Sequence, residues 1–99
     1  MPGRTISNRF WYVYVLRSLI DGERYIGFTS DLRKRMADHA RGKSFATAPR
    51  RPLELIYYEA CKMESDALRR ERYFKDTGGR RYLAQRLKDY QRANNSKLY

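Results

Sequence analysis

The stretch that most constrains the fold is residues 10–39, where two tyrosine-bearing segments are followed by a basic segment. From Trp11 to Leu16 the side chains alternate between two faces, and both faces carry apolar or aromatic groups. A strand with bulk on both faces is predicted to lie in the centre of a sheet. Asp21 and Gly22 provide a turn in which positive φ is tolerated, and residues 24–28 form the returning strand. The pattern therefore predicts a β-hairpin.

A basic amphipathic helix is expected directly after the hairpin. Thr29 or Ser30 can cap it, and Asp31 falls in its first turn, where the helix dipole favours an anion. Apolar residues then recur at four-residue spacing and mark the face expected to be buried: Leu32, Met36 and Ala40.

Arg35 and His39 lie one turn apart on this helix, beside its apolar stripe. A cation and an imidazole at that position indicate the edge of a cleft over the hairpin. The residues themselves also fit a structural interpretation, in which Arg35 snorkels to solvent and His39 is a satisfied boundary histidine.

Residues 41–52 are predicted to be a loop, because they contain Gly42, Pro49 and Pro52. Ser44 and Thr47 in this loop are either hydroxyl contacts to a nucleic-acid backbone or solvated side chains. Basic residues in the loop and elsewhere are expected to contact phosphates, and the proposed nucleic-acid-binding set is Arg33, Arg41, Lys43, Arg50, Arg51, Arg80 and Arg81.

A third strand is predicted over residues 53–60, and a helix should begin after Ser65 and end near Asp76, before Thr77-Gly78-Gly79. Glu71 stands in the middle of the stripe of this helix that should face the core. A buried carboxylate without a partner would cost several kcal/mol. Either an arginine, Arg24 or Arg35, or a metal ion must therefore meet it.

One last basic helix is expected, with an apolar stripe formed by Tyr82, Leu83, Leu87 and Tyr90. The elements predict an α+β fold in which a small three-stranded antiparallel sheet is flanked by helices in the order β-β-α-β-α-α. We expect a flexible arm over residues 1–9, a single domain over residues 10–92 and a frayed tail over residues 93–99.

Composition narrows the class of partner. The 99 residues include 22 Lys and Arg against 11 Asp and Glu, a net charge of +11 that would attract a polyanion. Nucleic acid is the expected partner. No membrane is expected, since no apolar run approaches transmembrane length, and no obligate protein partner is inferred. Cys61 is the single cysteine and no signal peptide is evident, which favours the cytoplasm.

The order of these residues resembles the GIY-YIG nuclease domain, and most closely its small standalone bacterial members. The resemblance rests on Tyr12-Val13-Tyr14, then Tyr25-Ile26-Gly27, then Arg35 eight residues after Gly27 and His39 four residues further on. It extends from about Phe10 to about Leu87. One departure is that Tyr12 and Val13 stand where the family motif has glycine and isoleucine.

The resemblance implies a GIY-YIG-type endonuclease that uses one divalent metal, Mg²⁺ or Mn²⁺, held by Glu71. Tyr14 would be the general base, with its phenol acidified by Arg35 or by metal-bound water. Tyr25 would hold the attacking water or a phosphate oxygen, and Gly27 would let the backbone approach closely. Arg35 would neutralise the transition state, and His39 would move a proton or orient a tyrosine. The expected catalytic set is thus Tyr14, Tyr25, Gly27, Arg35, His39 and Glu71.

Two functions compete. The first is a metal-dependent endonuclease that hydrolyses DNA phosphodiester bonds and acts in repair or recombination. Its substrate would be branched or single-stranded DNA, and RNA is kept as a further candidate. The alternative is a non-catalytic basic protein that binds RNA or the ribosome. Glu71 separates them, because an acid near phosphate repels the ligand unless a metal intervenes.

Overall fold

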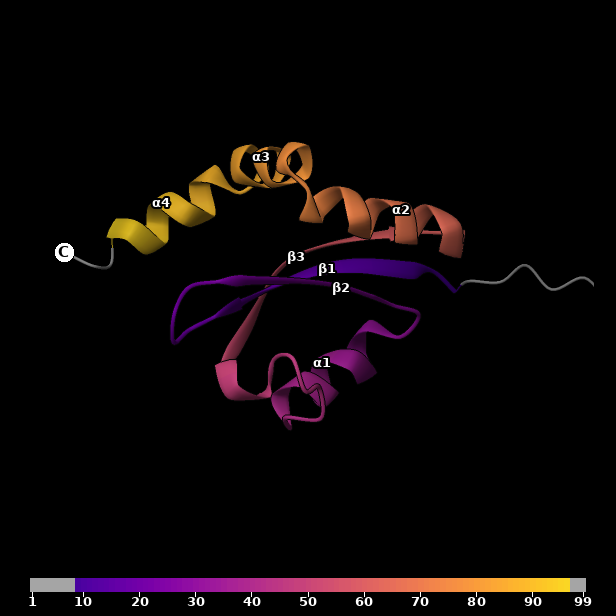
Figure 1. Cartoon of the computed structure of the whole chain (residues 1–99), viewed down its shortest axis with the longest axis horizontal. Coiled ribbons are helices and arrows are strands. Elements are labelled where there is room, and N and C mark those ends of the chain that lie inside the picture. The colour runs from indigo at the N-terminus through magenta and orange to yellow at the C-terminus, as the bar shows by residue number, and fades with distance from the viewer. Residues whose placement is uncertain (1–8, 97–99) are drawn as a thin grey trace, which may run out of the picture.

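A computed structural model describes residues 9–96 and contains one three-stranded antiparallel sheet. Its strands are β1 (Trp11–Ser18), β2 (Arg24–Thr29) and β3 (Leu53–Cys61), in the order β2-β1-β3. Helix α1 (Leu32–Ala40) covers one face, and α2 (Glu64–Lys75), α3 (Thr77–Arg86) and α4 (Lys88–Ser96) follow the other face (Figure 1). The predicted α+β fold class and the central position of β1 are confirmed.

The ends of the chain were predicted to be an arm over residues 1–9 and a tail over residues 93–99. Residues 1–8 and 97–99 lie outside the described residues, and residues 93–96 are helical because α4 ends at Ser96. No helix in the described part of the chain has both the length and the apolar character needed to cross a membrane.

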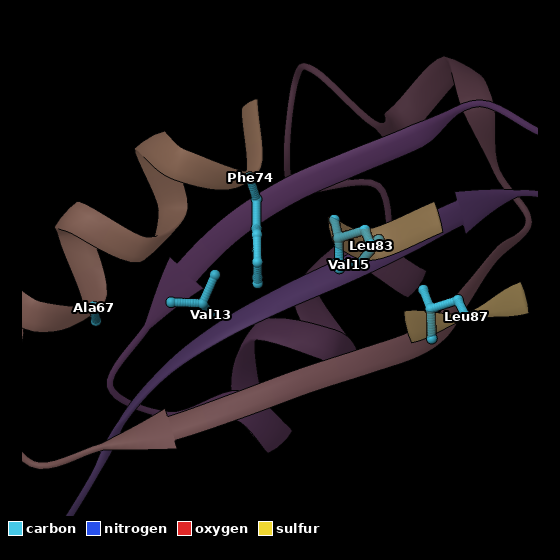
Figure 2. Close-up of a cluster of buried hydrophobic side chains, with 6 residues drawn as sticks. All are labelled: Val13, Val15, Ala67, Phe74, Leu83 and Leu87. Atoms are coloured by element: carbon cyan, nitrogen blue, oxygen red, sulfur yellow. The ribbon is translucent and has the colours of Figure 1, made fainter. Parts of the chain in front are cut away.

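Alternation along β1 divides its side chains between two layers. Val13 and Val15 point toward α2 and α3, where they pack with Phe74 and Leu83 in the core (Figure 2). Burying each such side chain contributes about 1.5–3 kcal/mol. Tyr14 is equally buried but points to the opposite face, toward α1. The apolar layer therefore stabilises the sheet while the α1 layer is left for polar side chains.

The β1–β2 turn closes as the Asp-Gly pattern predicts, with Gly22 at φ 76°. Ser18, at the end of β1, accepts hydrogen bonds from the Ile20 and Asp21 amides and donates one to the Arg50 carbonyl at 2.8 Å. One buried hydroxyl thus joins the hairpin turn to the loop before β3.

Helix α1 differs from its prediction in two ways. Asp31 is the N-cap, and it accepts a hydrogen bond from the Lys34 amide at 3.1 Å, so neither Thr29 nor Ser30 has that role. The buried face is also rotated: Ala40 is exposed, whereas His39 is only 1% exposed. The rotation follows from the polar partners that His39 finds beneath the sheet, described below.

The α2–α3 junction corrects a second prediction. The predicted end of the helix near Asp76 is confirmed, since α2 ends at Lys75. Thr77-Gly78-Gly79 does not lead into a turn, however: it forms the first turn of α3, which Asp76 caps by accepting from the Gly79 amide at 3.0 Å. A Cβ on Gly79 would lie 1.8 Å from the Tyr73 carbonyl oxygen, so glycine allows α3 to start directly against the end of α2. The last predicted helix is divided at Leu87 into α3 and α4.

Candidate active site

Tyr14 crosses the sheet from its central strand to the edge strand β2. Tyr14 pairs with Gly27 in the antiparallel register, and a Cβ on Gly27 would lie 2.4 Å from Tyr14 Oη and 2.5 Å from Cζ. The phenol therefore occupies the space that any other residue at position 27 would fill. Gly27 was expected to admit a close backbone approach, and the group that approaches is Tyr14.

A line of buried hydrogen bonds starts at this phenol. Tyr14 Oη lies 2.9 Å from His39 Nε2, and His39 Nδ1 lies 2.7 Å from Thr47 Oγ1. Burial, together with the charge of Arg35, lowers the pKa of His39 below its usual 6.5, so the imidazole is neutral at pH 7. When Tyr14 donates to Nε2, the Nδ1–H donates to Thr47. His39 is thus placed to receive the phenolic proton.

Burial raises the pKa of Tyr14 above its usual 10.0. The Arg35 Nε–H donates to Tyr14 Oη at 3.4 Å, and this bond and the Arg35 charge lower the pKa, but burial has the larger effect. Arg35 therefore acts on the pKa of the phenol in the expected direction but does not outweigh burial, and acidification by metal-bound water stays a prediction. Since the phenol keeps its proton more tightly than in water, its activation depends on an acceptor, and His39 is in contact with it.

Tyr25 lies beside this line on the same face of the sheet. Its ring centroid is 5.5 Å from that of His39 and 6.4 Å from that of Tyr14. Tyr25 also lines a hollow of about 530 Å³ between β2 and the α2–α3 layer, together with Lys75 and Arg80. The two tyrosines of the sequence motif therefore meet around one imidazole.

Glu71 lies on α2, on the face of the sheet opposite α1, and its side chain is 16% exposed. Burial is the main cause of the raised pKa of Tyr14, and the charge of Glu71 adds a small contribution in the same direction. Neither Arg24 nor Arg35, the two arginines considered from the sequence, forms an ion pair with Glu71. Its partner is Lys75 of the same helix, with Nζ 3.4 Å from Glu71 Oε2, and Arg24 instead donates to Gln91.

A single carboxylate can be the protein ligand of one hard divalent cation that keeps most of its waters, but it cannot form a site built only of protein ligands. Residues 9–96 contain no group of three or more His, Cys, Asp or Glu side chains that could hold a metal ion. Glu71 would supply the one protein oxygen, and water and phosphate would supply the rest, as Mg²⁺ commonly requires. Glu59 is not an equivalent candidate, because Arg70 donates two hydrogen bonds to its carboxylate, at 2.8 and 3.0 Å. The residues present fit a one-metal site.

The basic residues do not form one rim on one side of the sheet. Residues 41–52 lie on the side of the sheet that α1 covers. Helix α3, which carries Arg80 and Arg81, lies on the opposite side (Figure 1). Asp38 pairs with both Arg41 and Lys43, at 3.5 and 4.0 Å. A nucleic-acid surface that uses both groups must therefore cross an edge of the sheet, and Tyr25 lies on one edge strand, β2.

The remaining basic positions have distinct surroundings. Arg33 is exposed on α1, and Arg50 pairs with Asp21 at 3.9 Å. Arg51 donates to the carbonyl oxygens of Ala48 and Ala40, so it holds the loop in shape.

Thr47 is the residue that sequence reasoning placed wrongly. It and Ser44 were considered as phosphate contacts or solvated side chains, but they are 0% and 7% exposed. The Thr47 hydroxyl is hydrogen-bonded to His39 Nδ1 instead. Because Thr47 lies in a loop with no periodic pattern, no spacing rule connects it to a helix residue eight positions earlier.

Similarity to known proteins extends over most of the chain. The family model described as the GIY-YIG catalytic domain matches residues 10–83. The UPF0213 protein of Bacillus pumilus is 43% identical over 65 residues, which cover 65% of this chain and 65% of that protein, slightly under two thirds of its length.

Two further relatives are similar over comparable lengths. UPF0213 protein YazA of Bacillus subtilis is 40% identical over 70% of this chain and 68% of its own length. A UPF0213 protein of Lacticaseibacillus paracasei is 41% identical over 71% of this chain and 79% of its own length. The names of these relatives state no activity, and no solved structure gives a significant match.

Proposed function

This chain belongs to the GIY-YIG catalytic domain family, and from that membership and the geometry of its site we propose that it is a metal-dependent endonuclease that hydrolyses phosphodiester bonds in DNA. The observation that carries the proposal is the buried line from Tyr14 through His39 to Thr47. The same proposal includes a role in DNA repair or recombination and a location in the cytoplasm.

Hydrolysis needs a deprotonated water, a cation near the phosphate oxygens and a route for the proton. Tyr14 can take a proton from the attacking water while it gives its own proton to His39 Nε2, so the phenol need never exist as a free phenolate. Arg35, which donates to the same phenolic oxygen, is placed to neutralise charge that develops on the phosphate. Tyr25, whose ring lies beside those of Tyr14 and His39, would orient the water or a phosphate oxygen.

Glu71 would hold the divalent cation, Mg²⁺ or Mn²⁺, which when bound stabilises negative charge on the phosphate oxygens. Lys75 neutralises this carboxylate in the protein alone. Its side chain is more than half exposed, so it can move into solvent at small cost when a cation takes its place.

The alternative of a non-catalytic RNA or ribosome binder is less well supported by this geometry. Phosphate binding needs exposed cations, not a histidine that burial keeps neutral or the mostly buried carboxylate of Glu71. Those features cost stability, and a protein that only binds phosphate gains nothing from them.

The test is incubation of the protein with plasmid and branched DNA in the presence of Mg²⁺ or EDTA. Tyr14→Phe deletes the hydroxyl that contacts His39, and Tyr12→Phe is the matched control, since Tyr12 packs on Tyr58 of β3. We expect cleavage that requires Mg²⁺, is lost in Tyr14→Phe and is retained in Tyr12→Phe. A parent protein that binds DNA but cleaves none of these substrates with either cation would refute the proposal.

A further inference from the structure

Phe45 is the most exposed large apolar residue in the described part of the chain, at 97%. The other phenylalanines are packed to very different degrees: Phe74 is 1% exposed, Phe28 stacks on Trp11, and Phe10 is 37% exposed. A phenyl ring left almost wholly in water loses the gain that burial brings. Neither the fold nor the catalytic chemistry described above uses this ring.

The loop itself holds Phe45 outward. Its neighbours Ser44 and Thr47 are buried, and the Thr47 and Ala48 amides both donate to the Ser44 carbonyl, at 3.2 and 2.9 Å. The Lys43 amide donates to the Asp38 carbonyl at 2.9 Å, which ties the start of this turn to α1. Phe45 therefore stands at the apex of a hydrogen-bonded turn whose two ends are anchored beneath it.

The charge around Phe45 indicates what its ring would meet. Arg41 and Lys43 precede it with well exposed side chains, and the chain carries a net charge of +11. A second copy of this chain or another basic surface would be repelled, whereas a nucleic acid combines negative phosphates with flat aromatic bases. Paired bases in a duplex have their faces covered by their neighbours, so a base that is free to stack on Phe45 must be unpaired.

The loop also connects this ring to the site. Thr47, two residues after Phe45, is hydrogen-bonded to His39, which contacts the Tyr14 hydroxyl. We propose that Phe45 stacks on an unpaired nucleobase near the bond to be cut, and that the substrate is therefore a nucleic acid with single-stranded or unpaired nucleotides at the cleavage position. The inference rests on the proposed nuclease function and names the substrate class of that site.

The test measures binding without cleavage. A single-stranded oligonucleotide that contains 2-aminopurine is titrated with protein in EDTA, and stacking is read from the fluorescence of that base. Phe45→Ala is expected to weaken this binding by about 5-fold to 150-fold, the range for losing one base–aromatic stack, while Phe45→Trp retains it. Affinity for a fully paired duplex of the same sequence should not change.

Two controls separate aromatic stacking from a general apolar effect. Ile20→Ala removes a different exposed apolar side chain, in the hairpin turn, and should leave single-strand binding unchanged. Phe45→Leu keeps an apolar group without an aromatic face and should bind as weakly as Phe45→Ala. Because Phe45 has almost no packing to lose, all variants at this position should melt at the parental temperature.

Specific results would overturn the inference. They are parental single-strand affinity in Phe45→Ala, full rescue by leucine, or a protein dimer that Phe45→Ala abolishes in sedimentation. Cleavage bears on a different question: a parent protein that quenches 2-aminopurine through Phe45 but cuts no DNA refutes the nuclease proposal and leaves the stacking site standing.

Discussion

Replacing Gly27 with alanine adds one methyl group at the point where Tyr14 crosses β2. Position 27 does not have positive φ, so alanine is compatible with the backbone there. The new Cβ would lie 2.4 Å from Tyr14 Oη, 2.5 Å from Cζ and 3.0 Å from Cε1. The effect is therefore steric, and it falls on a ring that is 1% exposed and cannot move without leaving His39.

The magnitude follows from two contributions. Overpacking of this kind costs about 1–3 kcal/mol, and losing the Tyr14–His39 hydrogen bond costs about 0.5–1.5 kcal/mol, so Gly27→Ala should lower the free energy of unfolding by about 1.5–4.5 kcal/mol. In a Tyr14→Leu background the clashing atoms are absent, since leucine ends before Cε1. There the same change should be neutral or stabilising by up to about 1 kcal/mol, because alanine restricts the unfolded chain.

Urea unfolding of the parent, both single variants and the double variant measures this coupling as a double-mutant cycle. We expect an interaction energy of at least about 1.5 kcal/mol, worked from the same two contributions. Equal destabilisation by Gly27→Ala in both backgrounds, or no destabilisation in the parent, would refute the claim that Gly27 makes room for the phenol. Cleavage should also fall in Gly27→Ala at a temperature where the variant is fully folded.

Three further predictions concern the charges around the site. Glu71→Gln should abolish cleavage but leave DNA binding intact and change stability by less than about 1 kcal/mol, since its partner Lys75 is more than half exposed; a loss of several kcal/mol in urea unfolding would instead make Glu71 a structural residue. Burial lowers the pKa of His39, so its neutral form contributes stability that is present above pH 6.5 and is lost as pH falls from 6.5 toward the folded-state pKa. His39→Gln should flatten that decline in unfolding free energy, and an unchanged slope would show that His39 is not the titrating group. The double variant Arg80→Ala, Arg81→Ala should weaken DNA binding and leave turnover at saturating DNA unchanged. The slope of log affinity against log salt concentration should fall by about one unit for each phosphate that is no longer neutralised. A slope equal to that of the parent would show that α3 is not part of the interface.

Much of this molecule was predictable because the relevant signals are local in sequence. The two-sided apolar pattern of residues 11–16 indicates a central strand, and the Asp21-Gly22 turn indicates the hairpin. The family follows from the ordered spacing of the tyrosines, Arg35 and His39, because spacing within a hairpin and one helix is preserved when the chain folds. A central carboxylate in a helix stripe likewise marked Glu71.

Other properties depended on contacts between residues far apart in the chain. His39 meets Tyr14 across 25 positions and Thr47 completes the line from an aperiodic loop. The direction of the Tyr14 pKa shift could not be read from Arg35 alone, because desolvation is the summed effect of every element packed around the phenol and here exceeds the effect of one cation. The sequence thus determined which candidate groups the chain carries, and the tertiary structure decided which group the Tyr14 hydroxyl contacts and how deeply both are buried, because burial and hydrogen-bond geometry exist only once the layers are packed.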